Sequence, residues 1–254
     1  MDTDRSSVES LLEELVSDLQ VALGDDLIGI YLYGSYVSGG FDPGISDLDL
    51  VAVTSRDADR LDLARLERTH LAFAGRHPEL NDRIETVYVG VDTLRSFRTS
   101  RGRIAVISPG EPFHLRDDPV AAWVQNWYLV RETGIALFGP PASTLVPPVT
   151  WADFVAGSRR YAGEIASQDL NDHSPGHLAY VILTMCRARR VVETGTYGSK
   201  QEAAAWARER DPDRAWLIDA ALRCRLSAGM VGFDDPFTRA AAIAFIRESA
   251  LQTR

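Results

Sequence analysis

The sequence has few cysteines and no segment that would direct the chain into or across a membrane. Cys186 and Cys224 are the only cysteines among 254 residues, and their spacing fits no metal-binding motif. They indicate buried thiols in a reducing compartment rather than a disulfide framework. The N-terminus lacks the basic start and apolar stretch of a signal peptide, and no apolar run approaches the length of a membrane span. We expect a cytoplasmic protein with no membrane partner.

Positive charge is also scarce. The chain has 27 Lys and Arg residues against 36 Asp and Glu residues, a formal net charge of −9. Neutralising nucleic-acid phosphates needs a local excess of positive charge. The tightest basic cluster, Arg187, Arg189 and Arg190, has no interleaved aromatic residues. We therefore expect no nucleic-acid partner, and the acidic balance suits a cationic small molecule.

The chain divides into a mixed half and a helical half. Apolar runs rich in β-branched residues predict strands over 27–33, 48–53, 84–90 and 103–107. The densest cluster of Gly and Pro, at 138–148, predicts a domain junction. Beyond it, helical periodicity predicts helices over 151–168, 177–193, 200–210, 215–227 and 236–251. We predict an α+β fold: an N-terminal mixed-sheet domain (1–145) followed by a C-terminal all-α helical bundle (146–254). We expect a monomer.

The most informative motif joins the first two predicted strands. Gly34 and Ser35 follow the first strand, and Asp47 and Asp49 stand at the start of the second. Glycine lets the backbone approach a phosphate closely, and the serine adds a hydroxyl. Strand residues two apart share a face, so the two carboxylates project together. Such a pair suits Mg²⁺, which keeps phosphate oxygens and water as its other ligands. The alternative is a surface turn followed by an acid-edged strand.

A third acid, Glu85, begins the third predicted strand. Taken alone, it indicates an exposed strand edge, because glutamate is rarely buried without a partner. Taken with the aspartate pair and the strand order, it becomes a candidate for the third acid of a metal centre.

With these acids in place, the chain resembles the nucleotidyltransferase superfamily of the DNA-polymerase-β type. Within it, the chain is similar to the aminoglycoside adenylyltransferases that act on streptomycin and spectinomycin. The segments that carry the resemblance are 32–35, 39–40, 46–50, 85–87, 137–140, 181–187 and 199–207. It implies that the first domain is a nucleotidyltransferase domain.

The resemblance implies an enzyme that transfers AMP from ATP, with Mg²⁺, to a hydroxyl of an aminoglycoside or aminocyclitol antibiotic. Pyrophosphate would be released, and the modified drug would no longer act, which confers resistance. Asp47, Asp49 and Glu85 would bind the metal, and Glu85 would also be the general base. The phosphate-binding residues of the N-terminal domain would be Gly34, Ser35 and Ser46.

Two cations of the helical domain, Arg187 and Lys200, would reach the triphosphate. A cation near a helix N-terminus opposes the helix dipole, which favours a ligand role for Lys200 over a structural one. For Arg187 the alternative is a salt bridge on the helix surface.

The acceptor would lie between the domains, with its ammonium groups facing acids: Glu85, Glu111 and Asp172. Streptomycin-modifying members of the family carry a Trp and then an Asp before the helix that contains the matched Arg. Here that loop has no Trp, and His177 stands where the Asp aligns. We therefore expect spectinomycin to be favoured over streptomycin. The rival hypotheses are transfer to a different small molecule or to a protein, and an inactive, ligand-sensing relative.

Overall fold

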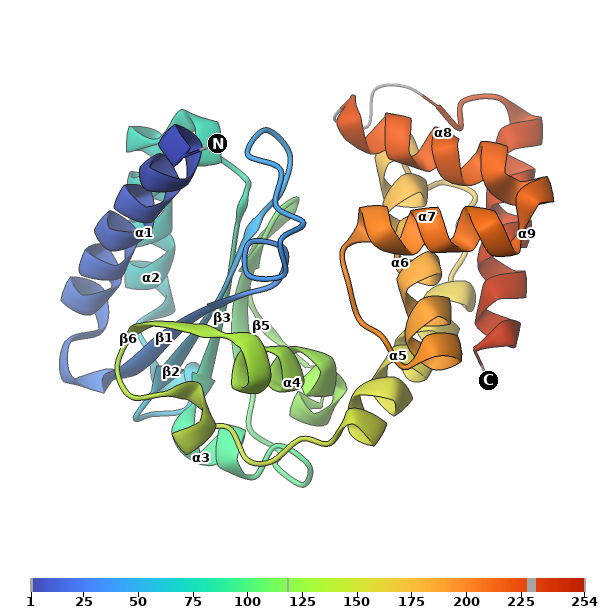
Figure 1. Cartoon of the computed structure of the whole chain (residues 1–254). Coiled ribbons are helices and arrows are strands. Elements are labelled where there is room, and N and C mark those ends of the chain that lie inside the picture. Colours follow the sequence, from blue (N-terminus) through green and yellow to red (C-terminus); the bar gives the residue numbers. More distant parts are fainter. Residues whose placement is uncertain (1, 118, 228–231, 254) are drawn as a thin grey trace. The chain divides into compact units, whose positions relative to one another are not determined.

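The computed structural model describes residues 2–117, 119–227 and 232–253, and the chain divides into two compact units, Met1–Thr150 and Trp151–Arg254 (Figure 1). The division falls five residues beyond the predicted boundary of 145. The reason is packing, because Leu145, Val146 and Val149 are all buried in the core of the first unit. The residues of the Pro-rich stretch therefore still belong to the core of the first unit, although they follow its last strand.

A six-stranded mixed sheet forms the centre of the N-terminal unit. Its strands are β1 (Leu27–Tyr33), β2 (Leu48–Thr54), β3 (Ile84–Gly90), β4 (Ile104–Ser108), β5 (Glu111–Arg116) and β6 (Ile135–Phe138). The order is β5-β4-β3-β2-β1-β6; β2 and β3 are parallel, and every other pair is antiparallel. The four strands predicted from the sequence are confirmed to within a residue at each end. β5 and β6 are additional strands at the two edges.

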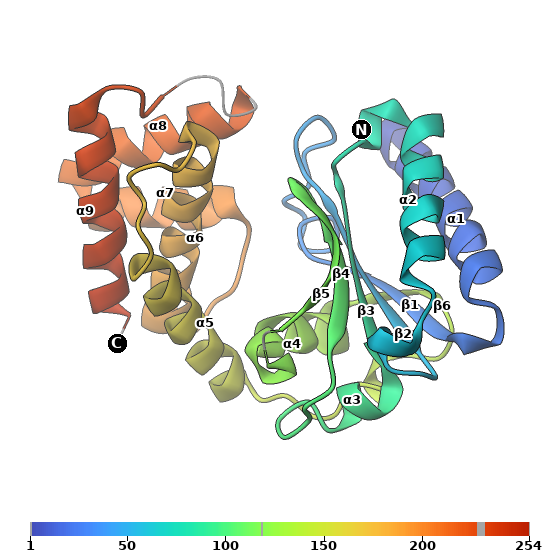
Figure 2. The ribbon, with the colours of Figure 1, turned by 180° about the vertical axis from the view of Figure 1, so that it is seen from behind.

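Helices cover both faces of this sheet. They are α1 (Asp2–Leu23), α2 (Leu63–Arg76), α3 (Val91–Arg95) and α4 (Val124–Thr133). α1 and α2 lie side by side on one face, and α4 lies on the other (Figures 1 and 2). Leu48 and Leu50 pack in the core on the α1 side, whereas Val51 packs with Trp127 of α4. Because side chains alternate along a strand, Asp49 projects to the α4 side of the sheet.

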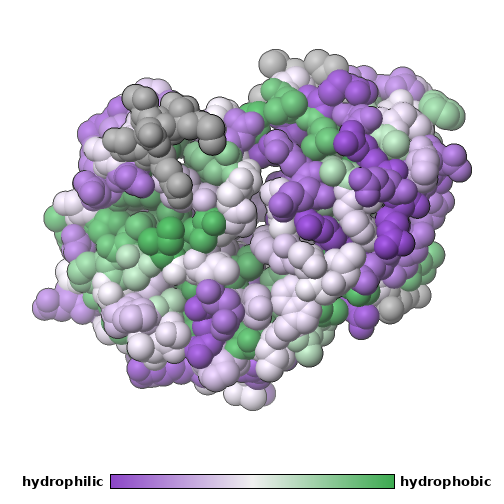
Figure 3. All heavy atoms as spheres, viewed as in Figure 1, coloured by the Kyte–Doolittle hydropathy of each residue, from purple (hydrophilic) through white to green (hydrophobic). Residues whose placement is uncertain are grey.

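The C-terminal unit is a helical bundle, as predicted. Its helices are α5 (Trp151–Ala166), α6 (Pro175–Thr194), α7 (Lys200–Arg210), α8 (Ala215–Leu226) and α9 (Pro236–Gln252). α6 contacts the other four and is buried along most of its length. Cys186 and Cys224 are buried free thiols in this core. On the face seen in Figure 3, the bundle presents mostly hydrophilic side chains.

Short 3-10 helices complete the two units. They lie at Gly24–Asp26, Ala58–Arg60, Pro78–Leu80, Val120–Trp123, Ala142–Thr144 and Pro212–Arg214. None of the helices in the part of the chain that the structure describes is long and apolar enough to cross a membrane.

Candidate functional site

A row of polar residues crosses one end of the sheet. Asp49 and Glu85 are neighbours in the register of the parallel strands β2 and β3, and Tyr33 of β1 stands opposite Asp49. On the other side, the Ser108 hydroxyl donates a hydrogen bond to Glu85 Oε2 at 2.9 Å, and Ser108 is paired with Glu111 of β5. These five residues form what we call the polar row. The register of the strands therefore brings together two of the three acids predicted from the sequence.

Gly34 makes room for this row. Its backbone has φ = +73°, a left-handed conformation, and a Cβ atom placed there would overlap the Asp49 carboxylate. Both the conformation and the close approach require glycine. A series of turns follows, in which the Ser38 amide donates to the Gly34 carbonyl at 3.0 Å and the Gly40 amide to the Ser35 carbonyl at 3.0 Å. Gly34 thus lies beside Asp49, and Ser35 follows it at the start of these turns; their role in binding phosphate stays a prediction.

Asp47 lies just before β2, and hydrogen bonds hold the loop that precedes it. The buried Ser46 hydroxyl accepts a hydrogen bond from the Asp42 amide at 2.9 Å. The Arg83 guanidinium donates from Nε and Nη2 to the Ser46 carbonyl, at 3.2 and 2.6 Å. Arg83 immediately precedes β3, so it ties the carbonyl just before Asp47 to the neighbouring strand. Ser46, predicted as a phosphate ligand, also has this structural role in the loop.

The charges around Glu85 act on its protonation. Burial raises the pKa of the Glu85 carboxyl above its usual range, and the hydrogen bond from Ser108 opposes this effect. The negative charges of Asp47 and Glu111 raise the pKa of Glu85 further, and the positive charge of Arg116 lowers it. Asp47 and Glu111 therefore lie near enough to Glu85 to gather negative charge at this end of the sheet.

This gathering of acids fits a magnesium ion. The donors are carboxylate oxygens, which Mg²⁺ prefers, and a cation would relieve their mutual repulsion. Within residues 2–117, 119–227 and 232–253, no group of three or more His, Cys, Asp or Glu side chains is arranged to hold a metal by itself. Mg²⁺ that arrives with a nucleotide needs only one or two protein carboxylates. Asp47 and Asp49 can supply them.

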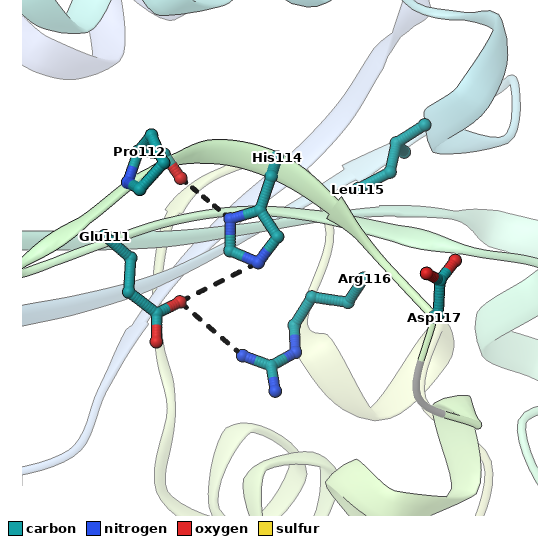
Figure 4. Close-up of a pocket in the computed structure, with 6 residues that line it drawn as sticks. All are labelled: Glu111, Pro112, His114, Leu115, Arg116 and Asp117. Atoms are coloured by element: carbon teal, nitrogen blue, oxygen red, sulfur yellow. Dashed lines mark hydrogen bonds and ion pairs between the residues drawn. The ribbon is translucent and has the colours of Figure 1, made fainter.

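A pocket lies along the edge strand β5, next to the polar row (Figure 4). It has a volume of about 470 Å³ and is lined by Glu111, Pro112, His114, Leu115, Arg116 and Asp117. The Glu111 carboxylate faces both His114, at 3.7 Å, and Arg116, at 3.8 Å. The predicted acceptor residue Glu111 is thus brought near Glu85, and two cationic or titratable neighbours share its charge.

In the C-terminal unit, Lys200 is the first residue of α7 and the only lysine of the chain. A capping box surrounds it: the Ser199 hydroxyl accepts from the Glu202 amide at 3.1 Å, and Glu202 Oε2 accepts from the Ser199 amide at 2.9 Å. Lys200 Nζ lies 4.6 Å from the centre of the Tyr180 ring. The one lysine therefore stands at a helix N-terminus, where the helix dipole disfavours a cation.

Three other predicted residues lie on or beside α6. Arg187 donates a hydrogen bond from Nη1 to the Tyr197 hydroxyl at 3.2 Å. Asp172 is exposed in the loop before α6, and the His177 ring stacks on His173 with 4.1 Å between ring centres. Burial lowers the pKa of His177, and the neighbouring His173 lowers it further. Both effects favour the neutral form of the His177 imidazole.

Ser108, Arg83 and Arg116 are among the residues of this site that the sequence patterns do not reveal. Ser108 directly follows a predicted strand, so a correct register between that strand and 84–90 was the one signal that could have found it. Arg83 carries the weak signal of a cation two residues before a candidate catalytic acid. Arg116 lies on a strand that the sequence does not predict, and nothing marks it.

The fold and the gathered acids define the class of protein. Residues 8–104 match the family model of the nucleotidyltransferase domain. Residues 144–247 match the model of the aminoglycoside adenylyltransferase C-terminal domain. The chain therefore belongs to the aminoglycoside adenylyltransferase family of enzymes, as the resemblance of the motifs implied.

Curated relatives agree with the family models. A spectinomycin 9-adenylyltransferase of Staphylococcus aureus is 28% identical over 204 residues, which cover 76% of this chain and 74% of the relative. An aminoglycoside (3'') (9) adenylyltransferase of Klebsiella pneumoniae is 28% identical over 233 residues, or 82% of this chain and 80% of the relative. A crystal structure of a spectinomycin adenyltransferase from Enterococcus faecialis, with ATP and spectinomycin, has a TM-score of 0.69. It is 19% identical, and the match covers 94% of this chain and 98% of that one. This structural likeness confirms the fold.

Proposed function

We propose that this protein transfers AMP from ATP to a hydroxyl of an aminocyclitol antibiotic, with spectinomycin as the preferred acceptor. The reaction depends on Mg²⁺, releases pyrophosphate and confers resistance to the drug. The observation that carries this proposal is the pairing of Asp49 with Glu85, with Asp47 close by, inside a nucleotidyltransferase domain.

The three acids Asp47, Asp49 and Glu85 have separate tasks in this reaction. Asp47 and Asp49 hold the metal, which when bound neutralises charge on the phosphate oxygens. The acceptor oxygen attacks the α-phosphorus of ATP, the bond from that phosphorus to the bridging β-phosphate oxygen breaks, and pyrophosphate leaves. The proton of the attacking hydroxyl passes to the Glu85 carboxylate. The raised pKa of Glu85 suits a base, because it increases the affinity for that proton.

Four further residues hold the triphosphate in this proposal. Gly34 and Ser35 contribute backbone and hydroxyl donors beside Asp49, and Arg187 and Lys200 contribute positive charge. In-line displacement needs positioning and charge stabilisation rather than a covalent intermediate, so no nucleophilic Ser or Cys takes part. Ser46 contributes by holding the loop that precedes Asp47.

The acceptor in this proposal is a cationic molecule whose ammonium groups interact with carboxylates of the protein. Glu111, whose charge acts on Glu85, lines the pocket along β5, and Asp172 is an exposed acid of the C-terminal unit. Support for spectinomycin comes from the named activity of the Staphylococcus aureus relative and from His177. A neutral imidazole gives the guanidinium groups of streptomycin no anionic partner, which costs about 1.5–3 kcal/mol, or roughly 10- to 100-fold in catalytic efficiency.

The test is a transfer assay with purified protein, α-labelled ATP and Mg²⁺, over spectinomycin, streptomycin and a DNA oligonucleotide. We expect a product heavier than spectinomycin by one adenylyl group, and no product in excess EDTA. No transfer to any aminocyclitol would contradict the proposed function. Equal efficiency on both drugs would contradict the role given to His177. The variant His177→Asp should raise the efficiency on streptomycin selectively.

The single lysine gives a separate test of nucleotide binding. Amine-selective acylation, followed by peptide mass spectrometry, reports on Lys200 and otherwise only on the N-terminal amine. ATP with Mg²⁺ should slow the acylation of Lys200, whereas adenosine, which has no phosphates, should not. Acylation that proceeds equally fast with ATP would remove Lys200 from the triphosphate site.

A further inference from the structure

We propose that Ser108 is a positioning residue that fixes the Glu85 carboxylate for proton transfer, an inference that rests on the proposed function. Ser108 is the last residue of β4 and Glu85 the second residue of β3. The Ser108 hydroxyl donates to Glu85 Oε2 at 2.9 Å. Among the described residues, no second hydrogen bond reaches the Glu85 carboxylate. One oxygen is thus held by the protein, and Oε1 can receive the proton of the acceptor.

The surroundings of Glu85 explain why its carboxylate needs to be held. Asp47 and Glu111 repel it, and Arg116 attracts it. A glutamate side chain has three rotatable bonds, so these unequal forces would draw it away from the reacting hydroxyl. A serine hydroxyl holds one oxygen by a directed bond and brings no full positive charge. The Ser108 hydroxyl therefore orients the base by a directed bond, without a salt bridge to a fixed cation.

Ser108 is itself held in place by the two loops beside it. The Asp82 carboxylate accepts a hydrogen bond from the Gly110 amide at 2.7 Å, which ties the loop before β3 to the turn after β4. Asp82 adopts a left-handed conformation with φ = +57°. Non-glycine residues hold that conformation at a cost, so the surrounding structure maintains it. This tie keeps the end of β4 beside the start of β3, and with it Ser108 beside Glu85.

The first test compares side chains of matched shape at position 108. Ser108→Thr keeps the hydroxyl, and Ser108→Val has nearly the shape of threonine without it; both suit a strand. We expect Ser108→Val and Ser108→Ala to lower kcat about 10- to 100-fold, as loss of an outer partner of a site residue typically does. Ser108→Thr should restore most of kcat. KM for ATP and for spectinomycin should stay within about threefold, because the proposal gives Ser108 a role in orienting Glu85 and none in binding either substrate.

The control is Ser96→Ala, which makes the same chemical change at an exposed site. The Ser96 hydroxyl donates to the Asp92 carbonyl at 2.6 Å at the end of α3, away from the polar row. This variant should keep the wild-type kcat. Thermal unfolding of each variant shows whether it is folded. If Ser108→Ala fails to fold, the comparison of kcat between Ser108→Thr and Ser108→Val decides whether the hydroxyl matters.

The second test asks whether Ser108 acts through Glu85. In the Glu85→Gln background the base is absent, so Ser108→Val should lower the single-turnover rate no further, within about twofold. A second full loss in that background would show that Ser108 acts independently of Glu85 and would overturn the proposal. An undiminished kcat in Ser108→Val would do the same. Failure of the proposed function would look different, because wild-type protein would then transfer no AMP to any aminocyclitol.

Discussion

Replacing Gly34 by alanine should lower both the stability of the fold and the activity of the site, and a control variant separates these two effects. Gly34 has φ = +73°, and an added Cβ would overlap the Asp49 carboxylate. Two consequences follow from that geometry. The left-handed conformation becomes unfavourable for the new side chain, and Asp49 has to move out of the polar row.

The first consequence has a predictable size. A left-handed conformation costs a non-glycine residue about 1–2 kcal/mol. In a domain of 150–250 residues each kcal/mol lowers Tm by roughly 2–4 °C, so the variant should melt about 2–8 °C below wild type. The second consequence appears in activity. Because Asp49 is a proposed metal ligand, kcat should fall by about 10²-fold or more, and more Mg²⁺ should be needed for half-maximal rate.

Gly24→Ala is the matched control. Gly24 also has a left-handed backbone, with φ = +55°, but a Cβ there would meet no atom within 4 Å. It precedes the start of β1, whereas the polar row crosses that strand at its last residue, Tyr33. Gly24→Ala should therefore have a lower Tm than wild type, with an unchanged kcat and an unchanged dependence on Mg²⁺. Equal kcat in Gly24→Ala and Gly34→Ala, measured together with their melting curves, would refute the reasoning about Asp49.

Three further changes have expected outcomes. Asp47→Asn should lower kcat by several orders of magnitude in a protein with wild-type Tm, and near-normal transfer at saturating Mg²⁺ would exclude the metal role. Lys200→Ala should weaken ATP binding about 10- to 100-fold, because it removes one charged hydrogen bond. An unchanged ATP affinity, measured by calorimetry, would contradict this role of Lys200. His70 is buried with its Nε2 2.6 Å from the Tyr88 hydroxyl, and burial lowers its pKa to about 4. In the unfolded chain the His70 imidazole takes up a proton near pH 6.5. The free energy of unfolding should therefore fall as pH drops from 6.5 toward 4, by about 3 kcal/mol in total. In His70→Gln, urea titrations should show this part of the pH dependence removed, and its persistence would show that other groups cause it.

The sequence predicted the central strands because their composition leaves little alternative. β1 to β3 are apolar runs with β-branched residues, and the structure buries them on both faces. The edge strands lack that signal. β5 contains Pro112 and three charged or titratable residues, and only Phe113 and Leu115 pack against the core. Proline is tolerated there because an edge strand leaves one side unpaired. β6 has four residues and is too short to produce a pattern.

The candidate site was predictable where chemistry appears in the residue types, and not where it depends on register. Asp47, Asp49 and Glu85 stand out as acids beside apolar strands, and a parallel pairing of β2 with β3 brings Asp49 next to Glu85. Ser108 becomes visible only when the antiparallel register of β3 with β4 is known. A serine after a strand is common, and its contact with Glu85 depends on that register.

The position of Asp47 shows why an acid motif alone does not make a site. Asp47 lies just before β2, outside the regular strand. Arg83 constrains the residues on either side of Asp47 by donating twice to the Ser46 carbonyl, while the Arg83 carbonyl accepts from the Leu48 amide at 2.9 Å. Those bonds grip the chain on both sides of Asp47. Because Arg83 stands two residues before Glu85, the entry to β3 holds one proposed metal ligand and carries the proposed base. This short segment of backbone thus links the proposed metal ligand Asp47 to the proposed base Glu85.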